Sequence, residues 1–182
     1  DMEAIGILES NSIAKGIEAA DAAMKAADIY LLYTKPVCPG KHITLFYGDV
    51  AAVHASLAAG ENVLEHHLVD SVVIARVHPQ VIQAMNLSTV PEQVNAVGIM
   101  EFFSITAAVY GADAAAKAAD VTLLEVRTGV GIGGKSIVVL TGEVAAVEEA
   151  VGAGVEMGHQ RGFVLTSTVI ARPKKEIFEA LL

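Results

Sequence analysis

Apolar residues fall into two kinds of segment that alternate along the chain. Short runs rich in β-branched and aromatic residues are typical of strands, and longer alanine-rich stretches are typical of helices. The first long stretch begins after Ser12, a residue type that commonly caps a helix N-terminus. In order, the first half predicts strand 4–9, helix 12–27, strand 29–33, strand 43–47, a helix from Val50, strand 69–77 and a short helix over 80–85.

The second half of the chain repeats the first. Residues 4–32 and 96–124 share sixteen identities in twenty-nine aligned positions, and the match resumes at 142–147 and 170–172. The repeat predicts strand 96–101, a helix from Ser104 to about Ala119, a strand ending at Gly142, a helix from Val144, strand 162–171 and a helix over 174–182. We interpret the chain as two tandem α+β sandwich domains, 2–88 and 94–182, each with a mainly antiparallel sheet flanked by helices.

Net charge and cysteine content indicate which classes of partner and which cellular compartment to expect. The formal net charge of −9 and the pI near 5.0 disfavour a nucleic-acid partner, because phosphate binding requires a basic face. No apolar run reaches the ~18–20 residues that a membrane helix requires, so no membrane partner is expected. A single cysteine in 182 residues is typical of a reducing cytoplasm.

That cysteine, Cys38, lies in a proline-bracketed turn, Pro36 to Lys41, between two predicted strands. Proline restricts both its own backbone and that of the preceding residue, so the turn is expected to be stiff. One thiol forms neither an intrachain disulfide nor a tetrahedral metal site alone, so it requires partners from other chains or acts as a nucleophile. His42 could serve as its base, but it begins a strand and has no acid nearby to orient it. A cysteine–histidine enzyme is therefore disfavoured, and the chain is expected not to be an enzyme.

The second copy carries a glycine-rich loop where the first carries Cys38. Gly129, Gly131 and Gly134 match the spacing of a dinucleotide fingerprint. That fingerprint must open a helix, whereas an apolar run over 136–140 predicts a strand here, so we reject the nucleotide interpretation. The histidines lack metal-ligand spacing, and the adjacent His66 and His67 are expected to point about 100° apart on a helix.

Four spaced motifs, each present in both copies, resemble those of bacterial microcompartment shell proteins. They are the opening A-x-G-x-x-E, the sequence KAAD at 25–28, the segment 48–53 and the sequence VIAR at 73–76. The resemblance covers nearly the whole chain and implies a tandem member of this family, which forms a homotrimer that imitates the six-fold tile of single-domain members. It also implies a place in a shell in the bacterial cytoplasm, beside other shell proteins.

Tandem members from propanediol-utilisation compartments, which this chain resembles, imply a role for the loop. Three Cys38 thiolates would hold one [4Fe–4S] cluster per trimer at a central pore, and Lys41 would offset their charge. The cluster would serve electron transfer across the shell, with an encapsulated or cytosolic redox enzyme as partner. The other pore-lining residues would be Pro36, Val37, Pro39, Gly40, Gly129, Val130, Gly131, Ile132 and Gly133.

The resemblance also implies that tile edges pack through charged residues. These are Lys25, Asp28 and Arg76 in the first copy and Lys117, Asp120 and Arg172 in the second. Two alternatives stay open at this point: a shell tile whose pore conducts a metabolite and holds no cluster, and a trimeric ligand-binding protein that does not tile.

Overall fold

The computed structural model describes residues 4–86, 91, 94–128, 133–161 and 164–181. The chain divides into two compact units, 1–77 and 78–182. The first unit contains β1 (Ala4–Ser10), α1 (Ile13–Ala26), β2 (Tyr30–Val37), β3 (Lys41–Gly48), α2 (Val50–Leu64), η1 (Glu65–His67) and β4 (Leu68–Ala75). The second contains α3 (Pro79–Asn86), β5 (Ala96–Phe102), α4 (Ile105–Ala118), β6 (Thr122–Thr128), β7 (Ser136–Gly142), α5 (Val144–Gln160), β8 (Val164–Ala171) and α6 (Lys175–Leu181).

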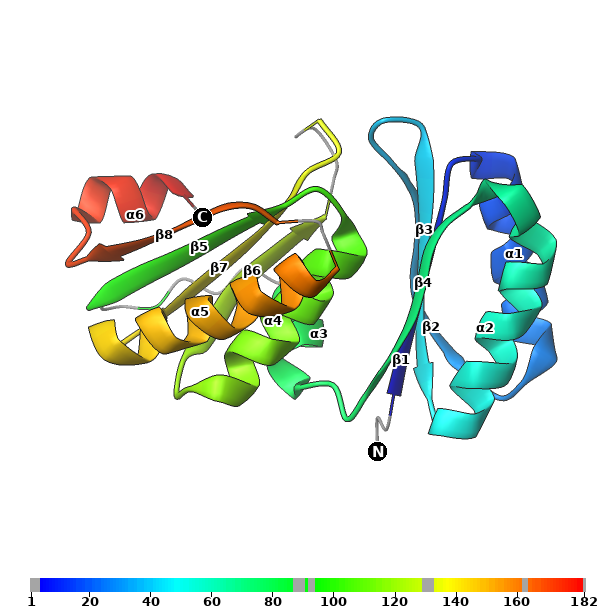
Figure 1. Ribbon diagram of the computed structural model, residues 1–182, viewed down its shortest axis with the longest axis horizontal. Helices are drawn as coiled ribbons and strands as arrows, with labels where there is room; N and C mark the ends of the chain where they lie inside the picture. The colour runs from blue at the N-terminus through cyan, green and yellow to red at the C-terminus, as the bar shows by residue number, and fades with distance from the viewer. Residues whose placement is uncertain (1–3, 87–90, 92–93, 129–132, 162–163, 182) are drawn as a thin grey trace. The chain divides into compact units, whose positions relative to one another are not determined.

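Each unit is built on a four-stranded antiparallel sheet with the same strand order. The order is β2-β3-β1-β4 in the first unit and β6-β7-β5-β8 in the second. Helices α1 and α2 lie together on one face of the first sheet, and α4 and α5 on one face of the second (Figure 1). The predicted α+β class and the duplicated antiparallel sandwich are confirmed.

The helices begin where the sequence predicts, because polar side chains cap them. Ser12 Oγ accepts a hydrogen bond from Lys15 N at 3.2 Å, and Ser104 Oγ accepts one from Ala107 N at 3.0 Å. Asp49 caps α2 in the same way, through Ala52 N at 2.8 Å. These capping bonds mark the starts of α1, α4 and α2, whereas the side chain of Glu143 makes no such bond at the start of α5.

Small residues let the helices approach their sheets closely. Helix α1 buries Gly16, Ala19, Ala20 and Ala23. The core of the first unit combines such alanines with larger apolar side chains from the sheet and α2, among them Leu8, Phe46, Leu57 and Leu64. In the second unit, α5 lies over Gly98, whereas Phe178 of α6 packs against Val97 and Val139. Adjacent strand residues point to opposite faces, so α6 covers the face opposite α5.

Helix α3 follows the first repeat in the sequence but packs in the second unit, against β6 and α4. The repeat places the domain boundary between 88 and 94, and the predicted linker over 87–92 falls mostly outside the described residues. Packing places the boundary between Val77 and His78 instead. No helix in the described part of the chain is both long and apolar enough to cross a bilayer.

Candidate functional site

Cys38 lies at the tip of the hairpin between β2 and β3. The strands extend further than the sequence predicted: Val37 pairs with Lys41, which leaves only Cys38, Pro39 and Gly40 in the turn. Gly40 has φ +75°, a backbone conformation that glycine adopts without strain. Cys38 is partly exposed and a free thiol, whereas Pro39 and Gly40 are fully exposed. The turn thus presents one thiol per chain.

The other predicted pore residues of this hairpin differ in exposure. Pro36 is exposed on β2, but Val37 is buried and supports the turn from inside the unit. An apolar collar around the thiol would therefore come from the prolines rather than from Val37. This difference arises because the strand continues to Val37, which places alternate side chains on opposite faces.

A buried ion pair supports the base of the hairpin. Lys41 Nζ lies 3.5 Å from Glu9 Oε2, and the two side chains are 18% and 1% exposed. The second unit repeats the pair, with Lys135 Nζ 3.1 Å from Glu101 Oε1. The pair therefore belongs to the hairpin in both copies, with or without a cysteine. Since the Lys41 charge is balanced by Glu9, it contributes less to offsetting a thiolate than the sequence suggested.

His42 follows Lys41 and points into the core. Its Nε2 lies 2.6 Å from Thr34 Oγ1, which also contacts Thr44 Oγ1 at 2.9 Å. Burial lowers the pKa of His42 below its ordinary value, because the charged imidazolium loses hydration. Its Nδ1 has no hydrogen-bond partner among the described residues. His42 is thus a buried core histidine whose Nε2 is engaged with Thr34.

The corresponding loop of the second unit lies partly outside the described residues. Gly129, Val130, Gly131 and Ile132 are not described, so their predicted pore-lining role stays a prediction. Gly133 and Gly134 have φ +66° and +81° and lead directly into strand β7. The strand predicted after these glycines is therefore present as β7, whereas a dinucleotide fingerprint opens a helix.

The predicted edge residues occupy three separate element ends in each unit. Lys25 bonds to Asp21 one helical turn earlier, at 2.5 Å, and Lys117 bonds to Asp113 at 2.6 Å. Asp28 and Asp120 lie exposed in the connections to β2 and β6. Arg76 and Arg172 are exposed and have φ values of +50° and +48° just after β4 and β8. The repeat of both exposure and backbone conformation agrees with a shared role for each pair.

The remaining histidines form no metal site. His66 and His67 lie in the short η1 turn rather than on an α-helix, and their rings are tilted by 39° with centroids 4.0 Å apart. His67 Nδ1 lies 2.8 Å from Asn11 Oδ1. Among the described residues, no group of three or more histidine, cysteine, aspartate or glutamate side chains is placed to hold a metal ion. A metal at Cys38 therefore requires several chains.

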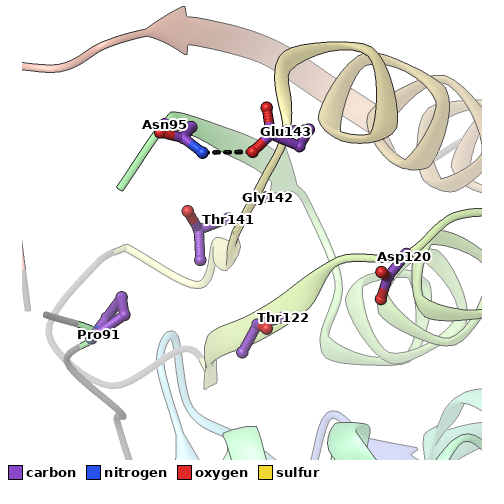
Figure 2. A pocket seen from close by; sticks show the side chains of 7 residues that line it. All are labelled: Pro91, Asn95, Asp120, Thr122, Thr141, Gly142 and Glu143. Carbon is purple, nitrogen blue, oxygen red and sulfur yellow. Dashed lines mark hydrogen bonds between the residues drawn. The ribbon is translucent and has the colours of Figure 1, made fainter. Parts of the chain in front are cut away.

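The second unit has one feature that the sequence analysis missed, a polar hollow of about 340 Å³. Figure 2 shows its lining, with Asn95 Nδ2 donating a hydrogen bond to Glu143. The lining residues are Pro91, Asn95, Asp120, Thr122, Thr141, Gly142 and Glu143. Thr141 Oγ1 donates to Ala96 O at 2.7 Å, and Asp120 and Glu143 contribute the two carboxylates of the lining.

Two differences between the copies lie at this hollow. Thr122 pairs with Thr141 across β6 and β7, and the same positions of β2 and β3 hold Tyr30 and Tyr47. The two tyrosine rings stack with centroids 5.2 Å apart. Comparing the copies residue by residue would have revealed the loss of two aromatic rings, which is the sequence signal for the hollow.

Comparisons with known proteins place both units in one family. The BMC domain model matches residues 4–77 and again 96–173. The chain is 40% identical over 180 residues to the bacterial microcompartment shell protein PduT of Citrobacter freundii, covering 99% of this chain and 98% of that protein. A single stretch of 81 residues is 38% identical to the major carboxysome shell protein CsoS1A of Halothiobacillus neapolitanus, covering 43% of this chain and 83% of that protein.

Solved structures agree with the sequence relatives. A microcompartment protein from Desulfitobacterium hafniense superposes with a TM-score of 0.90 at 49% identity, covering 98% of this chain and 99% of that one. A fused permuted hexameric shell protein from the RMM microcompartment shares the fold, with a TM-score of 0.63 at 23% identity and coverage of 86% and 81%. Two BMC domains in one chain, and relatives matched over nearly their full length, identify this protein as a tandem member of the BMC family of bacterial microcompartment shell proteins.

Proposed function

We propose that this shell protein forms a homotrimeric, pseudo-hexameric tile in which three Cys38 thiolates hold one [4Fe–4S] cluster at the central pore. The observation that carries the proposal is the position of Cys38. It is partly exposed at the tip of a three-residue turn, and the turn stands on a hairpin fixed by a buried ion pair. Such a thiol is accessible, yet its backbone is held in place.

Symmetry supplies the missing ligands. A cyclic trimer repeats every surface feature three times around one axis, so a single cysteine per chain becomes a set of three thiolates. A [4Fe–4S] cluster is normally held by four cysteines, so three would leave one iron for a small exogenous ligand. Pro36 and Pro39 would limit water around the site, which affects the reduction potential of such clusters.

A shell tile with this site would have a redox role. When bound, a [4Fe–4S] cluster supplies one-electron transfer. A trimer that spans the shell thickness would then link an encapsulated redox enzyme with a partner in the bacterial cytoplasm. The protein itself would remain a structural component with no catalytic residues, flanked by other shell proteins.

A second candidate is a tile whose pore conducts a small metabolite and holds no cluster. The repeated ion pair favours it, because Lys135 and Glu101 support a hairpin that has no cysteine. The hairpin therefore has a structural basis that does not depend on a metal. In this case Cys38 would be an ordinary pore-loop residue.

Iron and sulfide content separate the two candidates. Wild type and Cys38→Ser would be purified without oxygen, reconstituted under identical conditions and compared by iron, sulfide and visible absorption. We expect about four irons per trimer in wild type and none above background in the variant. The variant should keep the wild-type mass, because Cys38 lies in an exposed turn. Colourless, iron-free wild type would instead rule out the cluster and make Cys38 a pore-loop residue of a metabolite-conducting or plain tile.

A further inference from the structure

Helices α3 and α6 are equivalent elements of the two repeats. Each follows a strand that ends at an arginine with positive φ, Arg76 or Arg172. Each begins with the same hydrogen bond, from Val81 N to His78 O at 3.0 Å and from Ile177 N to Lys174 O at 3.1 Å. Both carry apolar residues at the same places, 81, 82, 84 and 85 in α3 and 177, 178, 180 and 181 in α6. The two helices therefore share their local structure and their apolar pattern.

Helix α3 is docked on the α4–β6 surface of the second unit. Gln80 bonds to the edge strand β6, accepting from Leu123 N at 2.8 Å and donating to Val121 O at 3.3 Å. His78 N donates to Asp113 Oδ1 at 2.7 Å. Val81 is completely buried, and Leu123 is 4% exposed. The contact thus combines one apolar anchor with hydrogen bonds to a strand edge and to a helix carboxylate.

The equivalent surface of the first unit, α1–β2, is uncovered. Leu31, the counterpart of Leu123, is 41% exposed, and Asp21, the counterpart of Asp113, is 61% exposed. Strand β2 is an edge strand, and its register shifts after Leu31 as that of β6 shifts after Leu123. The edge groups beside Leu31 are therefore laid out like those that Gln80 binds beside Leu123. Ile13, Ile17 and Met24 add exposed apolar area on α1.

Helix α6 has an apolar residue, Ile177, at the position of the α3 anchor Val81, and this residue is exposed. Phe178 holds α6 to its own sheet, against Val97, Leu124 and Val139. Ile177, the counterpart of the buried Val81, is 63% exposed. Helix α3 docks on the repeat that follows it in the chain, whereas the anchor position of α6 is left exposed. A second copy of the chain offers the surface that α6 lacks.

We propose that α6 of one chain docks on the α1–β2 surface of a second copy, repeating between chains the contact that α3 makes with α4 and β6. Ile177 is the apolar anchor, Glu176 accepts from the Leu31 backbone N–H in place of Gln80, and Lys174 N donates to Asp21. Glu176 is a carboxylate, so it does not reproduce the second bond, from Gln80 to a backbone carbonyl. This head-to-tail contact rests on the proposed trimer and assigns residues to its subunit interface.

Paired cysteines test the contact, with the α3 contact as a built-in standard. In a Cys38→Ser background, Gln80→Cys plus Leu123→Cys would report the known contact, and Glu176→Cys plus Leu31→Cys the proposed one. After mild oxidation and denaturing electrophoresis without reductant, the first pair should stay at monomer mass. The second should give covalent dimers and trimers that disappear with reductant. The proposal is overturned if the second pair forms a disulfide only within one chain, at monomer mass. It is also overturned if the second pair forms no disulfide while the first pair does.

Substitution of Ile177 tests this contact separately from the formation of a trimer. Burying an isoleucine side chain favours association by roughly ten- to a hundredfold, so Ile177→Asp should weaken the trimer at least about tenfold, and Ile177→Val should not. Sedimentation over a concentration series measures both variants. A monomeric wild type overturns the trimer and this contact together. A wild-type trimer that Ile177→Asp leaves intact overturns the contact alone.

Discussion

Three polar residues, Lys41, Glu9 and His42, lie at the base of the Cys38 hairpin, and burial there is tolerated for two different reasons. Lys41 and Glu9 form an ion pair, so neither charge is buried alone. His42 is buried without a charge and relies on Thr34 for its hydrogen bond. The base of the hairpin therefore contains a paired charge, Lys41 with Glu9, and an imidazole, His42, whose protonation affects the stability of the fold.

The lowered pKa of His42 predicts how the stability of the fold depends on pH. Its folded pKa is lowered, so the unfolded chain binds the proton more readily. The full contribution to stability is then present above the ordinary histidine pKa near 6.5 and is lost as the pH falls below it. We expect the urea midpoint of the first unit to decrease between pH 7.5 and 5.5 in wild type, and to decrease less in His42→Gln.

The exposed His54 on α2 provides a matched control for this prediction. His54→Gln should keep the wild-type pH dependence, because this side chain is exposed on α2 and is not part of the buried base of the hairpin. An identical loss of stability in wild type and His42→Gln would show that other groups determine the acid sensitivity.

At the level of elements, close helix-on-sheet packing depends on glycines at specific crossings. Helix α1 crosses β3 at Gly16, where an added Cβ would lie 2.5 Å from His42 Cβ. Helix α5 carries Gly152 on its outer side, with nothing within 4 Å of an added Cβ. Glycine thus serves close packing at position 16 and serves none at position 152.

These two glycines predict opposite responses to alanine. Gly152→Ala should stabilise the protein by about 0.5–1 kcal/mol, the difference in helix propensity. Gly16→Ala should destabilise it by about 1–3 kcal/mol, because overpacking against His42 exceeds that gain. Urea unfolding of both variants measures the difference. Stabilisation by Gly16→Ala would mean that α1 moves away from the sheet at little cost.

The fold was predictable from the sequence because its signals are local and occur twice. Ser12, Ser104 and Asp49 mark helix starts, and the apolar runs mark the strands. The docking of α3 was not predictable, since its partners Asp113 and Leu123 lie more than thirty residues away. For the same reason the pairing of Lys41 with Glu9 required the strand register. The Cys38 turn was located correctly but made too long.

For the whole molecule, duplication provides two versions of each surface that diverge where the functions of the copies differ. Only the first hairpin carries a cysteine, and the polar hollow of the second unit has threonines where the first unit has stacked tyrosines. By contrast, both copies keep an exposed lysine, aspartate and arginine at equivalent element ends. Features kept in both copies are the best candidates for contacts that every tile edge repeats.

Removing the edge charges predicts a loss of tiling with little change in the tile. Each exposed pair contributes only about 0.2–1 kcal/mol, but a lattice multiplies the contact along every edge. Lys25→Ala plus Arg76→Ala should therefore abolish sheets seen by electron microscopy and leave the solution mass unchanged. The control Lys15→Ala plus Lys35→Ala removes equal charge outside the predicted edge set and should still form sheets. Sheets of wild-type extent in the first variant would refute the edge assignment.

The central claim is that three chains share one cluster, and anaerobic native mass spectrometry measures both parts at once. After cluster reconstitution we expect one species of roughly 57 kDa, three times the 18.9 kDa chain, with the added mass of a single [4Fe–4S] unit. Cys38→Ser should give the same trimer without that added mass. A wild-type trimer at the mass of the bare protein, or iron retained by Cys38→Ser, would contradict the account.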